Sequence, residues 1–191
     1  SIIEGDGWHY VVKENKLYIQ ENNQEKSYEY LSDNIFAVEF ADSVETLLKS
    51  QFATYPNLEE VILSNNLNNL NTGAFKDCKK LQKITLPVGI TEIGENTFSG
   101  CSNLHTIDMK ADVVSIGRFA FYQCTGLKKV ILSEGLNSIS NSAFDNCSNL
   151  KTIALPEGLI KIEHWAFNNC SSLTDVIIPE GTVSVGGFSF Y

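Results

Sequence analysis

The sequence predicts a solenoid of stacked coils, in which short parallel strands form one curved sheet and short helical turns or irregular coil lie opposite. Three columns of residues support this prediction, and each recurs every 23 residues without insertion or deletion. Self-similarity at a fixed period of about 20 to 50 residues is typical of architectures in which each unit buries its apolar face against its neighbours. The columns are Phe52, Phe75, Phe98, Phe121, Phe144, Phe167, Phe190; Tyr55, Cys78, Cys101, Cys124, Cys147, Cys170; and Leu58, Leu81, Leu104, Leu127, Leu150, Leu173.

Each repeat contains a short strand, because a Val-x-Leu pattern alternates inward and outward side chains. We expect stacked copies of this strand to pair in parallel. The inward pairs are Val61/Leu63, Ile84/Leu86, Ile107/Met109, Val130/Leu132, Ile153/Leu155 and Val176/Ile178.

A turn follows the strand. In Pro156-Glu157-Gly158 the Pro and Gly stand two residues apart, which fits a type I turn with Gly at its last position. Gly, Asn and Asp all tolerate a positive φ, so we expect a left-handed residue at this point of every coil. The residues concerned are Asn66, Gly89, Asp112, Gly135, Gly158 and Gly181.

A second extended stretch carries paired apolar residues such as Leu136 and Ile139. The segment Ala-Phe-x-x-Cys-x-x-Leu then spaces apolar groups by three, which predicts one short helical turn. From Phe75 onward the residue before each Phe is small, so neighbouring coils are expected to approach closely there. These small residues are Ala74, Thr97, Ala120, Ala143, Ala166 and Ser189.

The two ends of the chain differ from the repeats. Subtracting 23 from the first clear copy gives five apolar residues, Ile35, Val38, Phe40, Val44 and Leu47, so the solenoid is expected to span 35–191 as six full repeats and a partial one. Residues 1–34 are expected to cap it with a β-hairpin turning at 14–16, and with a third strand at Tyr28 and Tyr30. The period would continue beyond Tyr191, so we expect further chain or a partner to cover the last coil.

Composition limits the function classes. The net charge of −9 disfavours nucleic acid and anionic membrane surfaces as partners. The apolar runs are all shorter than a membrane-spanning helix requires, so no membrane insertion by this segment is expected. No signal or anchor is recognisable in it either.

The five cysteines occupy equivalent positions of the repeat, and Tyr55 fills the same position one coil earlier. This indicates buried free thiols that act as small hydrophobes, although two sulfurs of neighbouring coils could come close enough for a disulfide. Their spacing does not fit a zinc site. His9, His105 and His164 fall at different positions of the coil, which disfavours a catalytic triad. No catalytic, metal or cofactor site is predicted.

Two surfaces remain as candidate binding sites. The outward side of the sheet carries mixed charges and β-branched residues, which is also what an ordinary solvated sheet would carry. Its candidate residues are Glu60, Lys83, Thr85, Thr106, Asp108, Lys129, Ile131, Thr152, Asp175 and Ile177. The other candidate is an aromatic patch of Phe119, Tyr122, Trp165 and Phe188, which would stack on sugars, anchor a protein, or simply pack between coils.

The repeat closely resembles the BspA-like leucine-rich repeats, a 23-residue class also called the Treponema-type repeat. The stretch AFDNCSNLKTIALPEGLIKIEHWAF (143–167) carries every position of that pattern, while 35–57 lacks its Cys and Pro and Asp112 replaces its Gly. The resemblance implies a leucine-rich repeat solenoid from a bacterial protein that is secreted or anchored at the cell surface. It also implies adhesion to host matrix proteins or other cells, and it supplies no catalytic residues.

The sequence therefore leaves two candidate functions. One is a non-catalytic binding module that mediates adhesion through protein–protein contacts. The other is a structural spacer, or an accessory module with affinity for carbohydrate, within a larger surface protein or enzyme.

Overall fold

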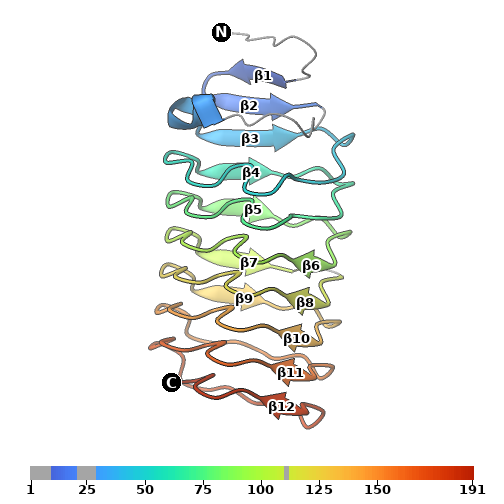
Figure 1. The fold of residues 1–191 in the computed structure, drawn as a ribbon, viewed down its shortest axis with the longest axis vertical. Coiled ribbons are helices and arrows are strands. Elements are labelled where there is room, and N and C mark those ends of the chain that lie inside the picture. Colours follow the sequence, from blue (N-terminus) through green and yellow to red (C-terminus); the bar gives the residue numbers. More distant parts are fainter. Residues whose placement is uncertain (1–9, 21–28, 110–111) are drawn as a thin grey trace.

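The computed structural model describes residues 10–20, 29–109 and 112–191, which form a rod of coils stacked along its long axis (Figure 1). The first strand column contains β1 (Tyr10–Lys13), β2 (Lys16–Ile19), β3 (Ala37–Phe40), β4 (Glu60–Ile62), β5 (Lys83–Thr85), β7 (Thr106–Asp108) and β9 (Lys129–Ile131). A second column beside it contains β6 (Glu92–Ile93), β8 (Ser115–Ile116), β10 (Ser138–Ile139), β11 (Lys161–Ile162) and β12 (Ser184–Val185).

The predicted parallel stacking of strands is confirmed. From β2 onward each strand pairs in parallel with the equivalent residues one coil away, so that Val61 of β4 lies opposite Ile84 of β5. In the first column the hydrogen-bonded ladder runs through β1–β5 and again through β7 and β9, and β5 contacts β7 between them. Bridges at Thr152 and Asp175 continue this column into the last two coils.

The N-terminal hairpin is present. β1 and β2 pair antiparallel around Glu14 and Asn15, whose φ angles of 50° and 65° suit a two-residue turn. Tyr30, expected in a third strand, instead lies in the 3-10 helix η1 (Glu29–Asn34), and Tyr28 lies outside the described residues.

The interior contains columns of identical side chains. Phe52 to Phe167 are at most 1% exposed, and successive rings from Phe52 to Phe190 stack at centroid distances of 5.0–5.8 Å. Each stacked pair is worth about 0.5–1.5 kcal/mol beyond its buried area. The five residues expected to begin the solenoid, Ile35, Val38, Phe40, Val44 and Leu47, are also buried. Inward packing ends at the last coil, where Ile178 is 38% exposed.

The cysteines are free and buried, as expected. Each thiol donates a hydrogen bond to the carbonyl oxygen of the Phe one coil earlier, at 3.0–3.2 Å. Burial raises the pKa of every thiol from Cys78 to Cys147, that of Cys78 to about 12. These thiols are therefore protonated and act as packing groups at neutral pH.

The expected left-handed residues are elsewhere in the coil. Asn66, Gly89, Gly135, Gly158 and Gly181 do not have positive φ. The N–H of Leu159 donates to the carbonyl of Pro156 at 3.0 Å, so Gly158 is the third residue of the turn, and the third residue of a type I turn has a negative φ. The expected left-handed residue Asp112 directly follows residues 110–111, which lie outside the described ranges.

Two other series have left-handed backbones. One is Ser50, Gly73, Asn96, Phe119, Ser142, Trp165 and Phe188, and the other is Thr54, Asp77, Gly100, Gln123, Asn146 and Asn169. Because the two series stand four residues apart, they interrupt the right-handed backbone that a helix needs. The expected helical turn is therefore a run of tight turns, and η1 is the one helix assigned in the described part of the chain.

We call the segments between these two series, beginning with 50–54 and 73–77, the turn wall. Its backbone hydrogen bonds between coils all run in one direction, since N–H groups of one coil donate to carbonyls of the next coil. The N–H of Phe121 donates to Ala143 at 2.7 Å, and that of Phe144 donates to Ala166 at 2.8 Å. Ala143 and Ala166 are fully buried, which explains the small residue before each Phe.

Candidate functional site

The outward residues of the first strand column form a continuous surface, which we call the sheet face. Parallel pairing places Glu60 opposite Lys83 and Thr106 opposite Lys129, and bridges align Thr152 and Asp175 with them. The ten predicted residues all lie on this side at least partly exposed: Glu60, Lys83, Thr85, Thr106, Asp108, Lys129, Ile131, Thr152, Asp175 and Ile177.

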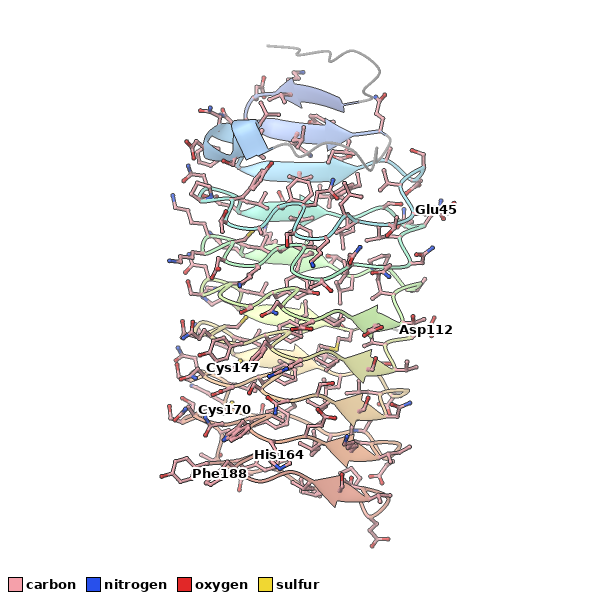
Figure 2. The ribbon with its side chains drawn as sticks, in the orientation of Figure 1. Glu45, Asp112, Cys147, His164, Cys170 and Phe188 are labelled. Atoms are coloured by element: carbon pink, nitrogen blue, oxygen red, sulfur yellow. The ribbon has the colours of Figure 1, made fainter. Side chains whose placement is uncertain are left out.

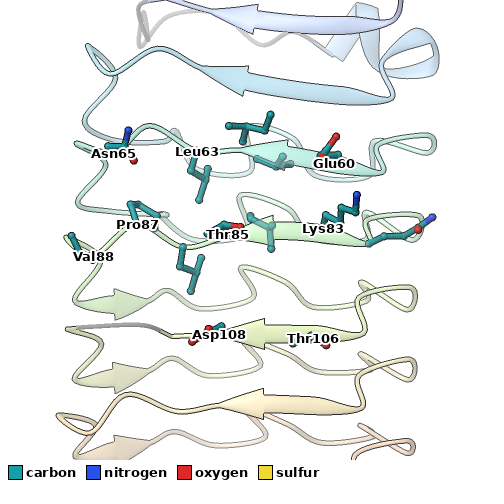
Figure 3. A pocket seen from close by; sticks show the side chains of 14 residues that line it. Glu60, Leu63, Asn65, Lys83, Thr85, Pro87, Val88, Thr106 and Asp108 are labelled. Carbon is teal, nitrogen blue, oxygen red and sulfur yellow. The ribbon is translucent and has the colours of Figure 1, made fainter.

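Two open depressions lie on the sheet face. The larger, of about 650 Å³, crosses β4, β5 and β7 (Figure 3), and the smaller, of about 480 Å³, crosses β9 and the next coil. The first is lined by Glu60, Lys83, Thr85, Thr106 and Asp108 among others, and the second by Lys129, Ile131 and Thr152. Asp175 and Ile177 lie outside both.

The sheet face combines charge with exposed aliphatic groups. Ile62 and Ile131 are 42% and 40% exposed, and Val88 at the edge of the larger depression is 62% exposed. Nearer the N-terminus, Lys16 forms an ion pair with Glu39 at 2.5 Å, and the hydrogen bond to this carboxylate raises the pKa of Lys16. The candidate residues predicted from the sequence did not include Ile62 or Val88, although Ile62 belongs to the same outward column as Ile131.

The structure brings the four residues of the predicted aromatic patch together only as two separate pairs. Trp165 and Phe188 stack in neighbouring coils with centroids 6.2 Å apart and planes 7° apart. Phe119 and Tyr122 are two coils away from Trp165 and form their own edge-to-face pair at 5.5 Å. Tyr191, which was not among the candidates, packs its ring against the edge of Phe188 at 5.7 Å.

Three of these aromatic residues have an unfavourable backbone. Phe119, Trp165 and Phe188 belong to the first left-handed series, with φ angles of 56–58°. A left-handed conformation costs an L-residue with a side chain about 1–2 kcal/mol, and bulky residues rarely adopt it. The signal that was missed is that the other coils use Ser, Gly or Asn at this position.

In the described ranges there is no group of three or more His, Cys, Asp or Glu side chains that could hold a metal ion. Among the same residues no helix is long and apolar enough to span a membrane.

Comparison with known proteins identifies the repeat. The family model for the BspA type leucine rich repeat region, with six copies, matches residues 22–121 and 103–191. No curated protein matches the sequence.

Solved structures share the fold. A leucine-rich repeat protein of T. pallidum is 21% identical with a TM-score of 0.75, and the match covers 92% of each chain. One from Bacteroides ovatus is 21% identical with a TM-score of 0.64 over 98% of this chain and 56% of the other. One from Eubacterium ventriosum is 26% identical with a TM-score of 0.61 over 88% and 51%. The chain thus spans about half the length of the latter two. It belongs to the BspA type leucine-rich repeat family.

Proposed function

We propose that the chain is a protein-binding module of a bacterial protein that is secreted or anchored at the cell surface. In this proposal it mediates adhesion to a host matrix protein or to another cell, and it catalyses no reaction. The observation that carries the proposal is the sheet face, where exposed aliphatic side chains lie among charges of both signs over two depressions.

Such a surface suits a protein partner. Apolar contacts with Ile62, Ile131 and Val88 would supply the desolvated centre that protein interfaces need. Lys83 and Lys129 next to Glu60 and Asp108 would set orientation and partner choice through charge complementarity. The net charge of −9 favours partners with basic patches.

The test is binding to a panel of immobilised extracellular matrix proteins, followed by surface plasmon resonance. Lys83→Glu, Lys129→Glu and Ile131→Arg are each expected to weaken binding about tenfold or more, as loss of an interface centre does. Lys79→Glu is the matched control, because Lys79 is exposed, lies in the turn after Cys78 and lines neither depression. Undiminished binding by all three variants would exclude the sheet face.

A second candidate is a spacer or accessory module of a larger surface protein or enzyme. The rod form, with β1 and β12 at opposite ends, favours this role (Figure 1). The two candidates are separated by the same panel, since a spacer would bind none of the matrix proteins yet keep its elongated shape in small-angle X-ray scattering.

A further inference from the structure

The first left-handed series provides an internal comparison of one backbone position across seven coils. Its φ angles lie between 52° and 64° whatever the side chain. Gly73, Asn96 and the serines at 50 and 142 suit this conformation, whereas Trp165 and Phe188 do not. The fold therefore requires the backbone angle and not the aromatic ring. A bulky residue kept at such a position indicates a role outside folding.

The rings of Trp165 and Phe188 are not part of the core. They are 42% and 60% exposed, whereas the neighbouring ladder residue Phe167 is 1% exposed. The two rings are parallel, with centroids 6.2 Å apart, and Tyr191 forms a T-shaped pair with Phe188. Together Trp165, Phe188 and Tyr191 form an apolar surface on the outside of the rod, which we call the aromatic platform. Figure 2 places Phe188, with His164, at the C-terminal end.

The other aromatic residue of this series is differently placed. The guanidinium of Arg118 lies over the ring of Phe119, 4.9 Å from its centroid. Phe119 therefore stacks with a cation of its own chain and is not part of the aromatic platform. This difference makes Phe119 a matched control for the platform.

The surroundings of the aromatic platform are polar, and their charged side chains are hydrogen-bonded or paired. Asn168 and Asn146 donate their amide groups to Oδ1 of Asp145, at 3.0 and 2.8 Å, and this carboxylate is only 9% exposed. Glu163 is paired with Lys161 at 2.6 Å. Exposed Asn169 and His164 complete the rim. Aromatic faces next to neutral hydrogen-bonding groups thus distinguish this surface from the charged sheet face.

We propose that the aromatic platform is a second site, distinct from the sheet face, that binds a neutral polysaccharide of pyranose units. A pyranose with equatorial hydroxyl groups has C–H bonds on both faces and hydroxyl groups around its edge. Its face can stack on Trp165 or Phe188, as bases stack on aromatic platforms, while Asn169 and His164 contact the hydroxyls. β-linked glucans have this geometry, and a neutral ligand needs no countercharge.

The test is native gel electrophoresis of the full chain in gels with barley β-glucan, with amylopectin, or with heparin. β-Glucan is expected to retard the protein, and Trp165→Asn and Phe188→Asn are each expected to weaken this binding about tenfold, the loss typical of removing one stacking ring. Phe119→Asn should bind as the parent does. Asn suits the left-handed backbone, so the three variants should keep the parent thermal midpoint or exceed it.

Fluorescence gives an independent readout. The chain has two tryptophans, so Trp8→Phe leaves Trp165 as the only one, and β-glucan should shift its emission to shorter wavelength. Absence of both retardation and this shift, retardation by heparin alone, or equal β-glucan binding by the parent and Trp165→Asn would each overturn the proposal. These outcomes do not affect the proposal for the sheet face, because binding of matrix proteins is measured separately.

Discussion

The thiol of Cys147 donates a hydrogen bond to the backbone carbonyl of Phe121 at 3.2 Å, across the boundary between two coils. Both residues are fully buried, so water cannot replace this contact. The cysteine column thus joins each coil to the one before it, in addition to filling the interior.

Cys147→Ala is therefore expected to lower the free energy of unfolding by about 1–3 kcal/mol, since it removes a buried sulfur and the partner of the Phe121 carbonyl. Urea denaturation followed by circular dichroism measures this. Cys170→Ala, near the open end and 7% exposed, serves as the comparison and should cost less. Equal stability of Cys147→Ala and the parent would contradict the role assigned to the thiol.

Stability should fall at alkaline pH. The pKa of Cys78 is about 12 in the folded chain against 9.0 for a free thiol, because burial disfavours the thiolate. The unfolded chain therefore releases this proton first, so the stabilisation is complete below pH 9 and decreases as pH rises toward 12.

Urea denaturation between pH 8 and pH 11 tests this. The free energy of unfolding should decrease above pH 9, and less steeply in Cys78→Ala than in the parent. A pH-independent stability over this range would show that the thiols ionise alike in both states.

The phenylalanine column gives a prediction that depends on position. Phe121 lies between Phe98 and Phe144, so Phe121→Ala should cost about 3–5 kcal/mol of unfolding free energy. Phe190 has a stacking partner on one side and is 42% exposed, so Phe190→Ala should cost much less. Thermal and urea denaturation of the two variants check the order, and equal losses would contradict a stack with an open end.

Two glycines should respond in opposite ways to alanine. A Cβ at Gly117 would lie 2.8 Å from backbone atoms of Ile93, Gly94 and Glu95, which cannot move aside. Gly117→Ala should therefore destabilise by more than about 1 kcal/mol.

Gly135 is the matched control. Its φ is not positive, and the nearest atom to an added Cβ is Oγ of Ser133 at 3.7 Å. Gly135→Ala should be neutral or stabilise by up to about 1 kcal/mol. A large loss at Gly135 would support the left-handed turn that the sequence alone predicts there.

The coil boundaries and the core could be predicted from sequence because one period places Phe121, Cys124 and Leu127 identically in every copy. Burial then follows from stacking alone. The backbone angles could not be predicted in the same way. Pro and Gly at 156 and 158 are compatible with several turn geometries. The hydrogen bond from Leu159 fixes which four residues form the turn, and the φ of Gly158, which is not positive, selects type I over type II.

The binding surfaces were predicted less completely. The sheet face follows from strand alternation, which fixes the side on which Lys83 and Ile131 lie. The strained state of Trp165 could not be predicted, because aromatic residues disfavour the left-handed conformation that its position requires. Serine and asparagine at equivalent positions gave a signal, but both residues also occur in ordinary turns.

The one-way hydrogen bonding between coils gives the turn wall an electrical direction of its own. Its peptide dipoles point the same way from coil to coil, whereas N–H groups outside the wall, such as those of Gly117 and Lys128, donate to the coil before. The amide hydrogens of each coil of the wall point toward the coil that follows it in the sequence. A further coil that extends the wall in this direction, from the same chain or from another, must therefore place a backbone carbonyl oxygen at every second residue to accept these N–H groups.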